Sequence, residues 1–165
     1  MITNLHQISS YIVTNSTFYL KSYEHRNKIY TLISDKHGET TYANKPLKII
    51  RSTCRLHGSS FEASKYQAKQ FFGKSKHKLP IMVAYDFGDP CILFPLFSPH
   101  SPQNIWISLH AIANITGSES GSETILTFID GSEKSFPLHI KSFNHQYVRA
   151  SMYYKYLILK RSKTL

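Results

Sequence analysis

Basic side chains crowd one stretch of the sequence, from Lys45 to Lys78, and phosphate binding is the chemistry that they could perform. The stretch reads KPLKIIRSTCRLHGSSFEASKYQAKQFFGKSKHK, with nine lysines and arginines against one acid, Glu62, a net charge of +8. The whole chain of 165 residues carries +10. Lysine and arginine neutralise phosphates and release counterions, which supplies affinity without sequence information. The stretch therefore predicts a polyanionic partner.

Sequence choice must come from contacts inside a groove or from DNA shape. Arg51 and Arg55 are the first candidates, because arginine suits the strong negative potential of a narrow A/T-rich minor groove. They are four residues apart and are followed by Gly58-Ser59-Ser60. The predicted nucleic-acid contacts are Lys45, Lys48, Arg51, Arg55, Ser59, Ser60, Lys65, Lys69, Lys74, Lys76, Lys78 and Arg149.

The same stretch interleaves its lysines with aromatic residues, namely Phe61, Tyr66, Phe71 and Phe72. Exposed aromatic rings beside lysines form stacking platforms for unpaired bases. A single-stranded nucleic-acid-binding protein is therefore an alternative to a reader of duplex DNA.

Catalytic residues are harder to find. The third alternative is a nucleic-acid-processing enzyme that uses a bound metal with Asp86, Asp89, Asp130 or Glu133. However, Asp130-Gly131 is typical of a hairpin turn, and Asp86 and Asp89 belong to a similar turn. The chain has no phosphate-binding glycine loop, nucleophile elbow or dinucleotide fingerprint. We predict that it is not an enzyme and needs no cofactor.

A metal site is not predicted either. Cys54-x-x-His57 offers two ligands where zinc needs about four. The second cysteine, Cys91, is distant in sequence, and two separate thiols do not form a disulfide framework. We expect both cysteines to be reduced.

Charge divides the chain into segments. Residues 79–140 carry a net −5 and residues 141–165 a net +6. The segregation favours a polyanionic partner over a merely solvated basic surface. The length suits one domain, residues 1–165. The start, MITNLHQISSYIV, lacks the features of a signal peptide, and no apolar run has transmembrane length, so we predict a cytoplasmic protein. A DNA partner would place it at the nucleoid.

Short β-prone runs fill most of the chain. NKIYTLIS, a DKHG turn and ETTYAN predict a hairpin, and PIMVAY, CILFPLF, NIWISL, HAIANIT, ETILTFI and KSFPLHI predict an antiparallel meander. Asn15-Ser16 separates two earlier β-prone runs, and Leu47, Ile49 and Ile50 are predicted to form a short buried strand. The fold class is α+β, one β-rich domain with antiparallel strands and hairpins.

Two helices are expected, one near 60–72 and an amphipathic one near 142–160. Ser59 and Glu62 have the spacing of a capping box, and Gly73 ends the first helix. Ser142 is the predicted N-cap of the second. The stripe predicted to face the core is Phe143, Tyr147, Ala150, Tyr154, Leu157 and Ile158. The opposite face, predicted to be exposed, holds Arg149, Tyr153, Tyr156 and Lys160.

Six segments resemble the competence transcription factor family, ComK, in the family's order and at its approximate spacing. They are KPLKII, CRLHGSSFEASK, SKHKLPIMV, ILFPLFS, NIWISLHAI and SFNHQYVRA. The resemblance implies a bacterial activator of genes for DNA uptake and transformation. It further implies binding to paired A/T tracts mainly through the minor groove of double-stranded promoter DNA, assembly as a homodimer or higher oligomer on DNA, and recruitment of RNA polymerase.

The chain departs from the family in two places. The family typically reads Arg-Ser-Cys where this chain has Ser52-Thr53-Cys54. If the family arginine touches DNA, either Arg51, one place earlier, replaces it or that contact is lost. Longer members carry a C-terminal extension that the adaptor of a Clp protease recognises. This chain ends soon after its final predicted helix, so that regulation is not carried over.

Overall fold

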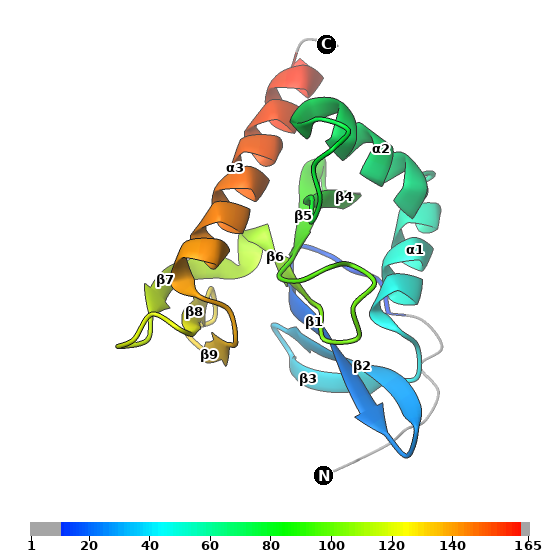
Figure 1. The fold of residues 1–165 in the computed structure, drawn as a ribbon. Coiled ribbons are helices and arrows are strands. Elements are labelled where there is room, and N and C mark those ends of the chain that lie inside the picture. The colour runs from blue at the N-terminus through cyan, green and yellow to red at the C-terminus, as the bar shows by residue number, and fades with distance from the viewer. Residues whose placement is uncertain (1–10, 163–165) are drawn as a thin grey trace.

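The computed structural model describes residues 11–162, which form two antiparallel sheets and three α-helices (Figure 1). The large sheet has the order β3-β2-β1-β6-β5-β4 and the small sheet the order β7-β8-β9. The strands of the large sheet are β1 (Thr17–His25), β2 (Lys28–Asp35), β3 (Gly38–Tyr42), β4 (Ile81–Asp86), β5 (Asp89–Pro95) and β6 (Ile105–Ser108). The other elements are α1 (Pro46–Leu56), α2 (Phe61–Phe72), the short 3₁₀ helix η1 (Leu109–Ala111), β7 (Ile112–Gly117), β8 (Thr124–Phe128), β9 (Glu133–Phe136) and α3 (Ile140–Ser162).

The central strands of the large sheet are buried on both faces. Leu93 of β5 and Trp106 of β6 belong to a core shared with α1 and the start of α2. Their neighbours Ile92 and Ile107 belong to a second core, shared with α3 and the small sheet. Because successive strand residues point to opposite faces, a strand covered on both sides must be apolar throughout. This explains the uninterrupted apolar runs CILFPLF and NIWISL.

The predicted α+β class is confirmed, and so are several of its turns. The DKHG turn joins β2 and β3, and Asp130-Gly131 lies between β8 and β9. The predicted meander is divided: β4, β5 and β6 pair in the large sheet, whereas β7, β8 and β9 form a sheet of their own. The division falls at η1, where the chain leaves the large sheet after Ser108.

The strand predicted at Leu47–Ile50 is wrong, because these residues lie in α1. Pro46 occupies the first helical turn, where its missing N–H and fixed φ cost nothing. Ile49, Ile50, Thr53 and Cys54 are buried together, at the spacing of one helical face. The prediction relied on Lys48 alone to suggest alternation and did not continue the pattern to Cys54.

The helix predicted near 60–72 is α2, but its cap is Ser60 and not Ser59. The Ser60 side chain accepts a hydrogen bond from the backbone N–H of Ala63 at 3.0 Å. Glu62 lies in the first turn, where its negative charge interacts favourably with the helix dipole and stabilises the helix. The helix ends at Gly73, whose φ of 113° favours glycine.

The C-terminal helix α3 begins at Ile140, two residues before the predicted cap Ser142. The backbone N–H of Lys141 donates instead to Nδ1 of His139 at 3.1 Å. Tyr153, predicted to be exposed, is fully buried, whereas Tyr147 and Tyr154 are only half-buried. Residues 163–165, the end of the basic C-terminal segment, lie outside the described range. Although α3 is long, no helix between residues 11 and 162 has the length and apolarity to span a membrane.

Candidate nucleic-acid interface

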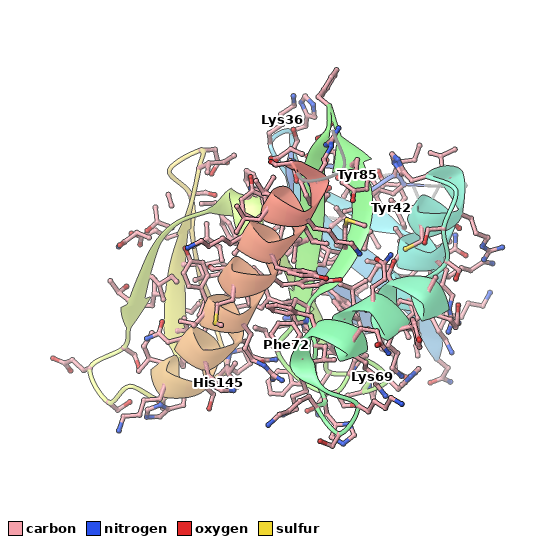
Figure 2. All side chains as sticks on the ribbon, turned by 90° about the horizontal axis from the view of Figure 1, so that it is seen from above. Lys36, Tyr42, Lys69, Phe72, Tyr85 and His145 are labelled. Carbon is pink, nitrogen blue, oxygen red and sulfur yellow. The ribbon has the colours of Figure 1, made fainter. Side chains whose placement is uncertain are left out.

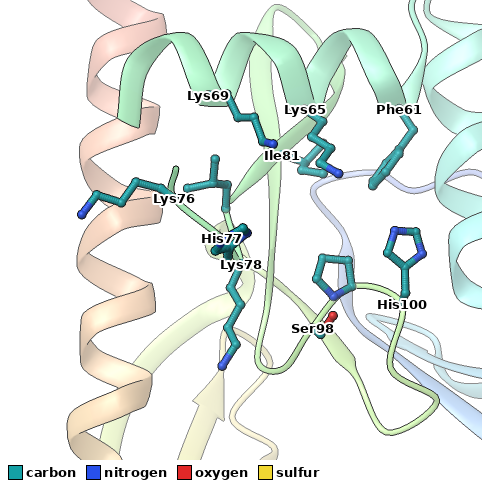
Figure 3. A pocket seen from close by; sticks show the side chains of 11 residues that line it. Phe61, Lys65, Lys69, Lys76, His77, Lys78, Ile81, Ser98 and His100 are labelled. Carbon is teal, nitrogen blue, oxygen red and sulfur yellow. The ribbon is translucent and has the colours of Figure 1, made fainter. Parts of the chain in front are cut away.

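Lys65 and Lys69 extend from one face of α2 because they are four residues apart. Phe61, Ser64 and Ala68 are buried beneath the helix. This orientation directs the two ammonium groups toward the loops below α2 (Figure 3). The helix thus places two predicted contacts at the edge of a hollow.

The loop between α2 and β4 contributes the next cations, and α3 holds this loop in place. The side-chain amide of Gln146 donates to the carbonyl oxygens of Lys78 and Pro95, each at 2.9 Å. Arg149 donates to the carbonyl of His77 at 3.3 Å. Lys78 has a φ of 55°, unusual for a residue other than glycine, and the bond from Gln146 fixes this turn. Gln146 is almost fully buried and was missed by the sequence analysis, which assigned only apolar residues to the inner face of α3.

Three hollows follow one another across this side of the molecule, and we call them together the basic trough. The central hollow, about 360 Å³, lies between α2, the 73–80 loop and the β5–β6 loop (Figure 3). A second, about 200 Å³, lies at the start of α1 and shares Pro99 and His100 with the first. A third, about 390 Å³, lies at the start of α3 and shares Lys78 with the first.

Positive charge lines the basic trough from end to end. Its cations are Lys45, Lys65, Lys69, Lys76, Lys78, Lys141 and Arg149, joined by His77, His100 and His145. Among the described residues, no Asp or Glu lines any of the three hollows. Lys69 and His145 lie on the same side of the molecule, with Lys36 at the opposite side (Figure 2). A concave surface of one sign focuses the electrostatic potential on an anionic partner.

The trough brings together half of the twelve predicted contacts: Lys45, Lys65, Lys69, Lys76, Lys78 and Arg149. It also adds Lys141 and His100, which the sequence analysis did not select. Lys141 belongs to the basic segment 141–165, so its charge was a usable signal. His100 lies in a loop of prolines and serines that offered no comparable signal.

The other six predicted contacts do not line the trough. Lys48, Arg55 and Ser59 are exposed on α1 and the turn after it, and Lys74 is exposed in the loop after α2. Ser60 uses its hydroxyl as the cap of α2.

Arg51, the sixth, makes contacts with other side chains at the protein surface. Its guanidinium lies 3.0 Å from the Glu62 carboxylate, and its Cζ is 5.3 Å from the centre of the Phe61 ring. Of the two arginines proposed for the minor groove, Arg55 is therefore the one whose side chain can extend into the groove.

We expect substitution of Arg55 to weaken DNA binding and substitution of Arg51 to lower stability. Arg55→Ala should weaken DNA binding about tenfold, because an exposed charged contact is lost, and should leave the free energy of unfolding within about 0.5 kcal/mol. Arg51→Ala should lower that free energy by about 1 kcal/mol, because it removes the ion pair and the ring contact. Chemical denaturation and a duplex titration measure both quantities. The assignment is wrong if Arg51→Ala weakens binding more than Arg55→Ala.

The interleaved aromatic residues mostly pack inside the protein. Phe61 is buried and meets Trp106 edge-on. Phe71 stacks on Tyr156 with ring centres 4.5 Å apart, and Phe72 contacts Phe71. Tyr66, which is 64% exposed, is the one ring of the four that is free to stack on a base. The four rings therefore do not form the continuous platform that the single-stranded alternative requires.

The acidic residues considered for catalysis have structural partners. Asp86 accepts a hydrogen bond from the backbone N–H of Asn15 at 2.9 Å, and Asp89 accepts one from the Tyr154 hydroxyl at 2.7 Å. Asp130 accepts hydrogen bonds from Ser132 in its turn, and these lower the pKa of the Asp130 carboxyl. Glu133 is exposed at the start of β9. Within residues 11–162, no three His, Cys, Asp or Glu side chains are grouped to hold a metal.

The cysteines are packing residues. Both are free and fully buried, and Cys54 lies in the core under α1 while His57 is exposed at its C-terminal end. Burial raises the pKa of the Cys54 thiol and raises that of Cys91 to about 12. Both thiols are therefore kept protonated and unreactive.

Comparison with known proteins identifies the family. The sequence model described as ComK protein matches residues 8–163. The chain belongs to the ComK family. One ComK relative, the competence transcription factor of Bacillus subtilis (strain 168), is 32% identical over 144 residues, which cover 87% of this chain and 73% of the relative. No solved structure matches the chain.

The region that matches the ComK model includes the whole basic trough. The match spans α1, α2, the 73–80 loop and the start of α3, so all three hollows lie inside the ComK region. It also includes the CRLHGSS segment at the α1–α2 turn, where Arg55 and Ser59 are exposed.

Proposed function

We propose that this chain is a sequence-specific, DNA-binding transcriptional activator of competence genes, acting as one domain at the nucleoid in the cytoplasm. The observation that carries the proposal is the basic trough, in which seven lysines and arginines line three adjoining hollows without an acidic neighbour among the described residues. Phosphates neutralise such a surface and fix the protein on the duplex. The competence transcription factor of Bacillus subtilis, a relative over most of this chain, supports the same function.

We infer that specificity comes from paired A/T tracts read mainly through the minor groove. Arg55 is exposed in the last turn of α1 and Ser59 in the turn after it, so both can enter a groove while the trough holds the phosphate backbone. A narrow A/T-rich minor groove attracts arginine by its potential. Two tracts would be served by two copies of the chain, so we propose a homodimer or higher assembly on the DNA, with RNA polymerase as its further partner.

The single-stranded alternative is supported by one observation, the concavity of the trough, since a positively charged groove also suits the backbone of a single strand. The burial of Phe61 and the packing of Phe71 against Tyr156 weigh against it. Selection of ligands from random duplexes and random single strands separates the two functions. Enrichment of duplexes with A/T tracts supports the proposal, and enrichment of single strands contradicts it.

Base substitution tests the choice of groove. Replacing A·T pairs by inosine·cytosine alters the major groove but leaves a minor groove without the guanine amino group. Binding should therefore survive this replacement within a factor of about three. Replacement by G·C adds that amino group and should weaken binding at least tenfold, by roughly 1–3 kcal/mol per pair. Loss of binding on the inosine·cytosine duplex would indicate major-groove readout and refute the minor-groove assignment.

A further inference from the structure

The central hollow of the trough is lined by both apolar and cationic side chains. Its apolar wall is formed by Phe61, Leu79, Ile81 and Pro99, of which the first three are almost fully buried. Lys65 and Lys69 extend from the same helix as Phe61, further along α2 and closer to His77 (Figure 3). A flat tract for phosphates needs only the cations, so the apolar wall indicates a ligand with a second, uncharged part.

The charge arrangement favours a compact anion at the α2 side. Lys65 and Lys69 are like charges four residues apart on one helix, a pairing that destabilises a helix. Glu62, the one acid on α2, is paired with Arg51 of α1, 3.0 Å away. A phosphate between the two ammonium groups would remove their repulsion and accept hydrogen bonds from both.

The size of the hollow sets the rest of the ligand. About 360 Å³ is at the lower end of small-molecule sites, enough for one ring system joined to one phosphate and too small for a stretch of duplex. His100 and Ser98 stand beside Pro99 at the far end of the apolar wall, where they can meet polar ring edges (Figure 3). Lys76 and Lys78 point away from the centre and leave the space to this ligand.

We propose that the central hollow binds a single nucleotide unit, with its phosphate between Lys65 and Lys69 and its ring against Phe61 and Pro99. The unit has two possible sources with the same chemistry, a free nucleoside monophosphate or an unpaired nucleotide of bound DNA. Only the second source rests on the proposed DNA-binding function. Because both occupy the trough, a free nucleotide would compete with DNA.

Calorimetry with the full chain tests the first source. At constant ionic strength, AMP should bind at least tenfold more tightly than inorganic phosphate or adenosine, because each of these fills one half of the site. Lys65→Gln/Lys69→Gln should weaken AMP binding at least tenfold. The control Lys36→Gln/Lys134→Gln removes the same charge from exposed positions outside the trough and should leave AMP binding unchanged. Unchanged melting temperatures show that both variants fold.

A duplex with one unpaired adenosine tests the second source. If the DNA supplies the nucleotide, this duplex should bind about tenfold more tightly than the fully paired one, and Lys65→Gln/Lys69→Gln should abolish the difference. The proposal is overturned if AMP binds no better than phosphate and the unpaired adenosine gives no gain. It is also overturned if the control Lys36→Gln/Lys134→Gln loses as much affinity for AMP as Lys65→Gln/Lys69→Gln does.

The two proposals fail separately. Paired DNA that binds while AMP and the unpaired adenosine do not would refute the nucleotide site and keep the DNA-binding function. AMP binding without any duplex binding would refute the DNA-binding function and keep the nucleotide site.

Discussion

The affinity of this chain for A/T-tract duplex should fall on the order of 10³-fold when monovalent salt rises from about 50 to about 200 mM. Seven lysines and arginines line the basic trough, and each phosphate that they neutralise contributes about −0.9 to the slope of log affinity against log salt. If all seven engage, the slope is about −6. A titration of labelled duplex at four or five salt concentrations measures it.

Two matched triple variants test whether the salt dependence of DNA binding comes from the trough. Lys76→Gln/Lys78→Gln/Lys141→Gln removes three charges from the trough and should make the slope shallower by about three, with affinity at ~100 mM salt lower on the order of 10²-fold. Lys28→Gln/Lys36→Gln/Lys134→Gln removes three exposed charges elsewhere and should change the slope by less than one. Equal losses in the two variants would mean that only net charge attracts the DNA, and the trough would lose its role.

The sequence predicted the charge of this surface but not its shape. Lys65 and Lys69 were placed on one face of a helix because a capping residue, the helix formers and Gly73 are local signals. The trough also needs the β5–β6 loop and the start of α3, which are distant in sequence from α2. Those contacts depend on the strand order β1-β6-β5-β4, which no local pattern reveals.

The errors in α1 and α3 have the same origin. Around Ile49, the residues on either side of Lys48 suggested alternation, and only the core beneath α1 decides which period applies. On α3, Tyr153 lies next to Tyr154, and the sequence gives no reason to bury the one rather than the other. The choice depends on α2, because Phe71 and Phe72 lie against that part of α3 and form the site for one ring.

The remaining prediction concerns Tyr153, which joins α2 to α3. Its ring is fully buried, and its centre is 5.7 Å from those of both Phe71 and Phe72. Truncating so large a buried side chain should be costly, so Tyr153→Ala is expected to lower the free energy of unfolding by about 3–5 kcal/mol. The exposed neighbour Met152 is the control, and Met152→Ala should change the free energy of unfolding by no more than about 0.5 kcal/mol.

Tyr153→Phe should behave differently from Tyr153→Ala. The Tyr153 hydroxyl is buried without a hydrogen-bond partner among the described residues, and burial raises its pKa. Removing a buried polar group that makes no bond is neutral or stabilising, here by up to about 1 kcal/mol. Chemical denaturation of the three variants gives the values, and a loss above about 1 kcal/mol in Tyr153→Phe would show that the hydroxyl is bonded.

DNA binding by the same variants tests whether Tyr153 supports the trough. The ring fixes the end of α2, and α2 carries Lys65 and Lys69. Tyr153→Phe keeps the ring and should bind duplex like the unmodified chain. Tyr153→Ala leaves the end of α2 without its support, so it should bind more weakly even at a temperature where it is fully folded. Equal affinity in a folded Tyr153→Ala would mean that the large sheet and α1 position α2 without this ring. The contribution of α3 to the interface would then come from Lys141, His145, Arg149 and the Gln146 side chain that holds the 73–80 loop.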